Sequence, residues 1–430
     1  MTRDRQDPML ADPDVVVIGG GVVGLCCAHQ LRQRGATVTV LERGALGGPQ
    51  SCSYGNTGFV GTHGAAPLAE PGMRALAVPG ATEPDSPWYI EPRADAELTR
   101  WLEHFRRACS VEAAAAGFRT LIGMKRRSLQ ILLELCATES IAATLESPGI
   151  VLAFKTAAGF DDARRGVERT VAAGVPLRVL GPGELGELEP KTVFDIHGAL
   201  YNPEGAYLHV PDFIVEFGRV LSDSGVDIRE HTEVAGFEVR ERNIVRLNTT
   251  RGELRPGNVV IAAGAWSAAC AHMAGVDLLL QSIKGHSVTV AMPPSAPCRP
   301  VLLSEGKLAM VPLGDRLRIG GQLEMTGMST EVSERRIRAL LRTVREFLPA
   351  LEETPTLHTW SGLRPCTPDS LPLIGAAGDL GNLLIAAGHG HIGMGLAPAS
   401  GELIAQLLAG EQPQTDPIPL RPNRFGGAVT

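Results

Sequence analysis

Residues 15–43, VVVIGGGVVGLCCAHQLRQRGATVTVLER, constrain the fold more strongly than any other part of the chain. The apolar run Val15–Ile18 predicts a strand that is buried on both faces, as in a parallel sheet. The next residues predict a helix over 22–34, which Gly35 then ends. A second strand is predicted over 36–42. Strand, helix and strand in this order predict a βαβ unit.

The turn between the first strand and the helix carries the pattern G-x-G-x-x-G, at Gly19, Gly21 and Gly24. In such a turn the first glycine permits the sharp bend, the second leaves space for a diphosphate, and the third lets the helix pack against the strand. The helix N-terminus, at Val22 and Val23, then offers free N–H groups to an anion. The spacing therefore predicts a dinucleotide site, and a purely structural glycine turn is the alternative.

Glu42 closes the second strand, 23 residues after Gly19. A carboxylate at this place can accept hydrogen bonds from both ribose hydroxyls, which argues against a 2′-phosphate and therefore against NADP. The motif alone does not separate NAD from FAD. Its position near the start of the chain favours FAD, by analogy with flavoproteins.

Composition excludes several other classes of protein. The chain has 430 residues and a net charge of −7, whereas nucleic-acid-binding proteins usually carry a basic excess. Its densest basic cluster, MKRRS at 124–128, is interpreted as a solvated helix end. None of the eight cysteines forms a C-x-x-C pair, so we expect reduced thiols, no metal or iron–sulfur site, and a cytoplasmic location.

A membrane-spanning helix is not expected, because no uninterrupted apolar stretch of about 18 residues occurs. The N-terminus also lacks the apolar segment of a secretory signal. Peripheral association with the inner membrane remains open, and the oligomeric state cannot be inferred from the sequence.

Periodicity outlines the rest of the chain. Residues 44–72 are rich in glycine and small polar residues and are expected to lie along a ligand, with a flexible surface loop as the alternative. Strands are expected within 283–323, followed by an amphipathic helix capped by Ser329 or Thr330. A helical insertion is expected from helices at 94–107, 110–117, 129–145 and 161–173.

Four further segments carry a family resemblance: SCSYGNTG at 51–58, VVIAAGAWS at 259–267, WSGLRPCTPDSLPLIG at 360–375, and NLLIAAGHGHIGMGLAPASGELIAQLL at 382–408. With the first βαβ unit, they resemble the D-amino-acid oxidase superfamily of flavoproteins. This group includes glycine oxidase, sarcosine oxidase, and the bacterial D-amino-acid and D-hydroxyproline dehydrogenases. The resemblance covers nearly the whole chain, least clearly residues 101–196.

The resemblance implies an α/β fold with an added antiparallel sheet, in which a Rossmann-type FAD-binding domain is interleaved with a substrate domain. Such interleaving means that each domain is built from discontinuous segments. The predicted FAD-binding domain comprises 14–90, 206–280 and 360–411. The predicted substrate domain comprises 91–205 and 281–359, and 412–430 is a tail.

The resemblance also assigns cofactor-binding residues. FAD would contact residues of the glycine turn, the second strand, the loop at 51–58 and the turns after two later strands. These residues are Gly19, Gly21, Val22, Val23, Gly24, Glu42, Arg43, Ser53, Asn56, Thr57, Gly58, Val234, Ala263, Gly264, Gly388, His389, Gly390, His391, Ile392 and Gly393. The glycines of 388–395 would let backbone N–H groups and a helix N-terminus approach the flavin, where they would stabilise the charge of its reduced form.

Three residues are candidates for the catalytic site. Arg364 in WSGLRP resembles the family arginine that binds the substrate carboxylate, a role suited to the parallel N–H groups of a guanidinium; a surface salt bridge is the alternative. His391 is expected at the substrate pocket, with a packed histidine as the alternative. His286 lies on a strand whose relatives often reach the active site. His389 and His391 lack a third ligand, so a metal site is not predicted.

The chain departs from its relatives at several positions. Ala309 stands where glycine oxidases carry an active-site tyrosine, with Lys307 two residues before it, and this puts glycine oxidase activity in doubt. Arg318 stands where sarcosine oxidases carry a flavin-facing lysine; a surface arginine is the alternative. Cys366 is displaced from the position used for covalent attachment, so the FAD is expected to be non-covalent.

The function implied is oxidation of a small D-amino or cyclic imino acid to its imine, by hydride transfer to flavin N5. D-hydroxyproline or D-proline is favoured over D-alanine as the substrate, and a quinone or electron-transfer protein is expected to accept the electrons. His391 or His286 could assist as a base with a pKa near the working pH. Three alternatives remain: an oxygen-using oxidase of glycine or sarcosine type, a flavin subunit of a multi-chain dehydrogenase, and a flavin-binding protein without turnover.

Overall fold

The first strand of the chain lies inside a six-stranded sheet. In the computed structural model, which describes residues 12–62, 64–138, 141 and 145–426, β1 (Val15–Ile18) pairs in parallel with β2 (Val38–Leu41) and with β14 (Asn258–Ile261). The strand order is β10-β2-β1-β14-β21-β20, and only the pairing between the last two strands is antiparallel. The edge strands are β10 (Asp227–Arg229) and β20 (Leu373–Ala376), and β21 (Leu383–Ala387) lies between β14 and β20. With α1 (Val22–Gln33) between β1 and β2, the predicted βαβ unit is confirmed.

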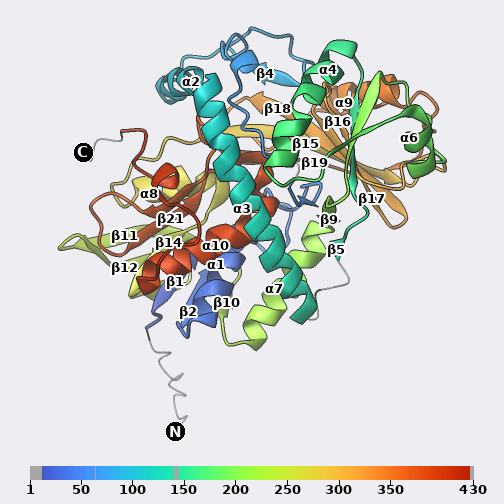
Figure 1. Cartoon of the computed structure of the whole chain (residues 1–430). Coiled ribbons are helices and arrows are strands. Elements are labelled where there is room, and N and C mark those ends of the chain that lie inside the picture. The colour runs from blue at the N-terminus through green and yellow to red at the C-terminus, as the bar shows by residue number, and fades with distance from the viewer. Residues whose placement is uncertain (1–11, 63, 139–140, 142–144, 427–430) are drawn as a thin grey trace.

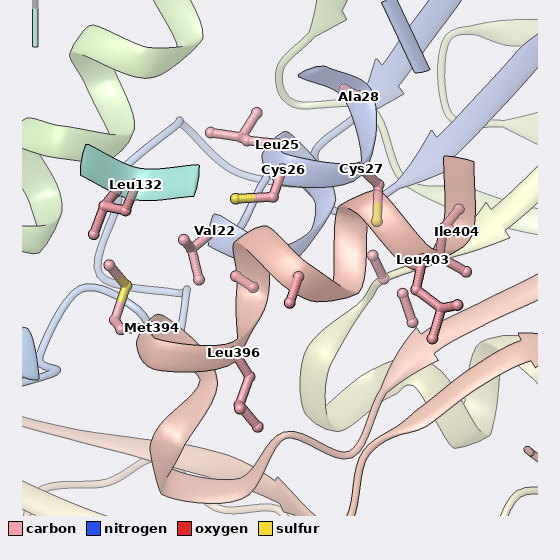
Figure 2. Close-up of a cluster of buried hydrophobic side chains, with 14 of the residues drawn as sticks. Val22, Leu25, Cys26, Cys27, Ala28, Leu132, Met394, Leu396, Leu403 and Ile404 are labelled. Atoms are coloured by element: carbon pink, nitrogen blue, oxygen red, sulfur yellow. The ribbon is translucent and has the colours of Figure 1, made fainter. Parts of the chain in front are cut away.

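Helices cover one face of this sheet. α1 packs against α10 (Gly393–Ala409), and α10 packs in turn against α3 (Val111–Thr138), with α7 (Val210–Asp223) also against α1 (Figure 1). Figure 2 shows the apolar side chains between them. The labelled residues are Val22, Leu25, Cys26, Cys27, Ala28, Leu132, Met394, Leu396, Leu403 and Ile404.

The stretch Gly390–Ala409 is long and apolar enough to cross a membrane, judged by length and composition alone. In the structure, however, 72% of its most apolar window is buried inside the protein. The apolar composition of α10 is therefore explained by its place between α1 and α3.

A second, nine-stranded sheet lies beside the first (Figure 1). Its order is β19-β15-β18-β17-β16-β6-β8-β7, and β4 pairs with the end of β18. Most pairings are antiparallel, whereas β16 with β6 and β18 with β4 are parallel. Its strands are β4 (Trp88–Ile90), β6 (Ile150–Phe154), β7 (Arg178–Leu180), β8 (Gly198–Asn202), β15 (Gln281–Ala291), β16 (Val301–Leu303), β17 (Leu308–Leu313), β18 (Arg316–Met325) and β19 (Thr356–Cys366).

Smaller elements complete the fold. Two three-stranded sheets contain β11 (Val234–Arg240), β12 (Asn243–Thr249) and β13 (Gly252–Leu254), and β3 (Phe59–Val60), β9 (Ala206–Leu208) and β5 (Leu145–Glu146). The other helices are α2 (Ala96–Ala108), α4 (Ala157–Arg165), α5 (Val167–Ala172), α6 (Pro182–Leu188), α8 (Ser267–His272) and α9 (Glu334–Phe347). Short 3-10 helices are η1 (Pro71–Met73), η3 (Gly264–Trp266), η4 (Gly390–Ile392) and η5 (Ile418–Leu420).

The structure corrects the interpretation of the basic cluster at 124–128. The two helices predicted around it, at 110–117 and 129–145, are a single helix, α3, and the cluster lies in its middle. Met124, Lys125 and Ser128 are buried, because this side of α3 faces α10. The cluster is therefore not a solvated helix end.

Other expectations about the elements also change. The predicted helical insertion contains one strand of the nine-stranded sheet, β6, which pairs with β16 and β8. The helix expected at 161–173 is divided into α4 and α5 at Gly166. α9 begins later than expected, and its N-cap is Ser333, whose hydroxyl accepts the Arg336 N–H, rather than Ser329 or Thr330.

The strands cross the segment boundaries expected from the sequence at two places. β4 belongs to the nine-stranded sheet although it precedes residue 91, and β19 runs through residue 360 to Cys366. The described part of the expected tail packs on the protein, since Leu420 is buried and Arg424 forms an ion pair with Asp369.

The α1–α10 contact can be tested with one methyl group. A Cβ at Gly401 would lie 2.4 Å from the Cys26 carbonyl oxygen, so one of the two backbones must move. We expect Gly401→Ala to lower the free energy of unfolding by about 1–3 kcal/mol. Gly123→Ala is the control, because a Cβ there meets nothing within 4 Å and should stabilise α3 by up to about 1 kcal/mol. Equal unfolding midpoints in urea for the two variants would contradict the packing described.

Candidate active site

The glycine turn brings α1 directly onto the end of β1. Gly19 has a φ of +114°, and a Cβ there would lie 2.4 Å from the Ala262 carbonyl oxygen of the neighbouring strand. A Cβ at Gly24 would lie 1.8 Å from the Gly19 carbonyl oxygen. Gly21 is the N-cap of α1 and supplies no side-chain hydrogen bond, and no acidic residue follows in the first turn. The N–H groups at this helix end are therefore available to an anion.

A large cleft opens over this turn. It contains about 1300 Å³ free of protein atoms, its open mouth included. The turn, the end of β2, the loop after it and the residues after β14 and β21 all contribute to its wall. Of the residues predicted from the sequence, the lining includes Gly19, Gly21, Val22, Val23, Glu42, Arg43, Ser53, Asn56, Val234, Ala263, Gly264, His389, Gly390 and Gly393.

Glu42 holds the wall of the cleft in place. One carboxylate oxygen accepts the Gly20 N–H at 2.8 Å, and the other accepts the Gly44 N–H at 2.8 Å. Each oxygen retains a second lone pair for a ribose hydroxyl. Glu42 thus fixes the glycine turn as well as lining the cleft.

Arg43 and Trp266 meet at one end of the cleft. The Arg43 guanidinium carbon lies 3.6 Å from the centroid of a Trp266 ring, a cation–π contact, and both residues line the wall. Trp266 was not among the residues predicted, although an aromatic residue in the turn VVIAAGAWS, directly after a buried strand, is a usable signal. The lining also includes other residues that were not predicted: Gln50, Ser51, Cys52, Thr232, Glu233, Ala265, Cys270, Met273, Pro365 and Met394.

Arg364 lies near the end of β19, next to Pro365 of the cleft wall. Its guanidinium donates to the carbonyl oxygens of Gln322 at 2.6 Å and Gly321 at 3.3 Å, on β18. Gln322 has a φ of +60°, in a β-bulge that turns these carbonyls to the guanidinium. Within the described residues no carboxylate forms an ion pair with Arg364, so the predicted alternative of a surface salt bridge does not describe it.

A small second cavity lies beside Arg364's strand. It is lined by Ala66, Leu68, Cys366, Thr367, Ser370, Gly388, His389, Gly390, His391 and Ile392. Burial lowers the pKa of His389 to about 3, and its Nε2 lies 2.9 Å from the Ser400 hydroxyl. The surrounding protein and the charges of Arg364, Lys125 and Lys307 also lower the pKa of His391, although this side chain is exposed at the cavity. Both imidazoles are therefore neutral near pH 7.

These features have counterparts in known proteins. Residues 14–407 match the family model described as "FAD dependent oxidoreductase". The chain belongs to this family.

Similar proteins extend over nearly the whole chain. It is 28% identical over 418 residues to a D-amino acid dehydrogenase of Granulibacter bethesdensis, covering 96% of this chain and 100% of the relative. It is 30% identical over 406 residues to a D-amino acid dehydrogenase of Methylobacterium radiotolerans, covering 93% and 96%.

The fold is shared with solved structures. Glycine oxidase from Geobacillus kaustophilus superposes with a TM-score of 0.77 at 24% identity, covering 96% of this chain and 99% of the other. L-proline dehydrogenase from P.horikoshii gives a TM-score of 0.74 at 22% identity, with coverage of 96% and 98%. The predicted fold class, a Rossmann-type FAD-binding unit with a substrate-side sheet, is therefore confirmed.

The residues of the cleft fit FAD. A Cβ at Gly21 would lie 3.7 Å from the Ser51 hydroxyl and 3.6 Å from the Ser53 hydroxyl. It would occupy the space above the α1 N-terminus, where the diphosphate would bind. Gly24, Thr57 and Gly58 do not line the cleft. They support it instead: Gly24 contacts β1, and a Cβ at Gly58 would lie 1.9 Å from the Leu208 carbonyl oxygen. Gly388, His391 and Ile392 line the small cavity only.

Arg318 anchors the loop along the FAD cleft. Its guanidinium donates to the carbonyl oxygens of Tyr54 at 3.2 Å and Asn56 at 3.3 Å, and Nε donates to the Thr289 hydroxyl at 3.3 Å. Arg318 is buried, which excludes the predicted alternative of a surface arginine. Lys307 is exposed and Ala309 lies on β17 opposite Leu302, outside both cavities, whereas Cys366 lines the small cavity.

His286 does not reach the FAD cleft, which corrects its prediction as a catalytic residue. Successive residues of a strand face opposite sides of the sheet. Gly285, the residue before His286 on β15, faces Arg364, so the His286 side chain points to the opposite face. There its Nδ1 lies 3.0 Å from Glu324 Oε1, and its Nε2 accepts the Ser333 N–H at 3.2 Å. Burial raises the pKa of Glu324, but the hydrogen bond from His286 and the charge of Arg336 lower it overall.

Gly285 leaves the space that Arg364 occupies. A Cβ at residue 285 would lie 2.1 Å from both terminal nitrogens of Arg364, so Gly285→Ala should displace the guanidinium from the β18 carbonyls. We expect a loss of about 1–3 kcal/mol in the free energy of unfolding, from overpacking. In the Arg364→Ala background the same change should cost less than about 1 kcal/mol, since its clash partner is gone. Equal costs in both backgrounds, measured by urea unfolding, would refute this geometry.

Proposed function

We propose that the protein oxidises a small D-amino acid or cyclic imino acid, of the D-hydroxyproline, D-proline or D-alanine type, to its imine. The observation that carries this proposal is Arg364, a cation without a carboxylate partner in the described structure, whose neighbours Pro365 and Cys366 line the FAD cleft and the small cavity. The names of the curated relatives support amino acids as the substrate class.

Arg364 would bind the substrate carboxylate. Two of its N–H groups are engaged by the β18 carbonyls, and the rest of the guanidinium fork remains for a bidentate contact. These backbone contacts limit the rotation of the guanidinium, so a carboxylate bound to it would place the α C–H in a defined position. Non-covalently bound FAD would supply the hydride acceptor.

The pocket favours the neutral amine of the substrate. The positive charges of Arg364, Lys125 and Lys307, which help to lower the pKa of His391, would also disfavour an ammonium group. A neutral amine can form the imine without a side-chain base. The idea that His391 acts as a base with a pKa near the working pH is therefore not supported, and a hydrogen-bonding role at the pocket remains.

Substrate size follows from the small cavity. Ala66, Leu68 and Ile392 form the apolar part of its wall, and its polar residues are Thr367, Ser370, His389 and His391. Such a wall suits a short or cyclic apolar side chain better than a long or charged one. We further propose a quinone or an electron-transfer protein as the electron acceptor, on the resemblance to bacterial dehydrogenases.

Substrate class and acceptor can be tested together. The purified protein, loaded with FAD, is mixed anaerobically with D- and L-amino acids, and flavin absorbance is followed. We expect bleaching by D-proline, D-hydroxyproline or D-alanine, and faster reoxidation by a soluble quinone than by air. Rapid peroxide formation in air would favour an oxidase of glycine or sarcosine type, and bleaching by no amino acid would exclude the proposed activity.

Removal of Arg364 gives the sharpest test of its role. Arg364→Ala should retain FAD but lose about 2–5 kcal/mol of transition-state stabilisation in kcat/KM, the usual cost of breaking one side of a buried charge pair. Arg364→Lys should recover only part of this, because an ammonium cannot form the bidentate contact. Near wild-type kcat/KM for Arg364→Ala would refute the assignment.

A further inference from the structure

Lys125 is a buried cation to which the proposed reaction gives no direct contact with the substrate. Its side chain is only 2% exposed, in the middle of α3. Its Nζ donates one long hydrogen bond, 3.3 Å, to the Gly61 carbonyl oxygen. No carboxylate pairs with it among the residues that the structure describes.

The ammonium lies behind the wall of the FAD cleft. A Cβ at Gly395, in the first turn of α10, would be 3.1 Å from Nζ. The two residues before it, Gly393 and Met394, line the cleft. The charge of Lys125 is therefore separated from the cofactor cleft by the first turn of one helix.

This position is unfavourable for a positive charge while the flavin is neutral. Burying an ammonium without a counter-ion costs several kcal/mol, and the N-terminus of α10 carries a partial charge of the same sign. Burial lowers the pKa of Lys125 to about 8. A methionine would fill the same space without this cost, so packing alone does not account for a lysine here.

Few other charges face Lys125. His391, in η4 before α10, is the titratable group coupled to it and is neutral near pH 7. On the α3–α10 interface the next charges, Arg127 and Glu402, pair with each other at 2.9 Å. Lys125 also contacts the segment 58–62, through the Gly61 carbonyl, and this segment contains no ionisable side chain. A negative charge that appears in the cleft would therefore act on Lys125 without a nearby carboxylate to oppose it.

We propose that Lys125 is an electrostatic partner of the bound flavin, and that its ammonium stabilises the negative charge that the flavin gains on reduction. In the pH range in which Lys125 is neutral beside the oxidised flavin, reduction also drives the uptake of one proton from solvent: one N–H bond forms on the amine, and the hydride and electrons come from the substrate as before. The ammonium then stabilises the reduced cofactor through the first turn of α10. This proposal rests on FAD in the cleft and does not depend on the identity of the amino acid.

The test compares three holoproteins with the wild type. Lys125→Met removes the charge at similar length, Lys125→Arg makes it permanent, and Arg126→Met removes an exposed cation from the neighbouring position as a control. The midpoint potential of the flavin is measured from pH 6 to 10, together with its affinity for sulfite, which adds a negative charge to the oxidised flavin.

We expect Lys125→Met to weaken sulfite binding roughly tenfold at pH 7, the size that Coulomb's law gives for unit charges several ångströms apart in a protein. For a two-electron couple, a tenfold change corresponds to about 30 mV in the midpoint potential. The difference from wild type should disappear toward pH 10, where the wild-type lysine is neutral. Lys125→Arg should keep the higher potential at all pH values, and Arg126→Met should match the wild type.

Equal potentials and sulfite affinities for Lys125→Met and wild type across this range would overturn the proposal and leave Lys125 with a structural role. A second measurement applies even if Lys125→Met does not retain FAD. Between pH 8 and about 10.4 the unfolded chain keeps a proton on Lys125 that the folded apoprotein has lost. The stability of the wild-type apoprotein relative to Lys125→Met should therefore rise with pH in this window, and a flat difference would show that Lys125 does not titrate as proposed.

Discussion

The approach of α1 to β1 determines the rest of the site. Because no side chain separates Gly24 from the Gly19 carbonyl, the helix begins directly over the end of the strand. Its first N–H groups then face a cleft rather than a capping side chain. The other walls meet these groups: Glu42 fixes the turn from β2, and the residues after β14 and β21 close the opposite side. A dinucleotide is the ligand for which such a set of donors is suited.

The nine-stranded sheet separates two kinds of charged residue. On the face toward the cleft, Arg318 and Arg364 donate to backbone carbonyls and lack carboxylate partners within the described structure. On the opposite face, His286, Glu324 and Arg336 form a buried ion-pair cluster with α9. The unpaired cations therefore lie where an anionic cofactor and a carboxylate would bind, and the paired ones support the sheet.

Local sequence patterns predicted much of this molecule. The βαβ unit and the glycine turn follow from spacing and periodicity, and fourteen of the cofactor residues that the family resemblance implied line the main cleft. The failures concern contacts between distant segments. Residues 124–128 have the composition of an exposed helix end, and only the packing of α10 against α3 buries Lys125.

The prediction for His286 failed for a related reason, because its environment depends on contacts between distant segments. Its strand was correctly expected near the site, but the choice between its two faces depends on pairing with β19 and on the bulge at Gln322. Neither the partner strand β19 nor the bulge, which lies on β18, can be predicted from the segment IKGHSVTV around the histidine. Trp266, in contrast, lies in the segment VVIAAGAWS, which carries part of the family resemblance, and could have been predicted.

The order of strands in the six-stranded sheet has a consequence for biosynthesis. β1 lies between β2, which follows it within the first 41 residues, and β14, while β21 and α10 come from the last quarter of the chain. As the polypeptide emerges from the ribosome, its glycine turn is made early but lacks the strands that enclose it. The nascent chain therefore lacks a complete nucleotide-binding cleft until β21 and α10 have been synthesised.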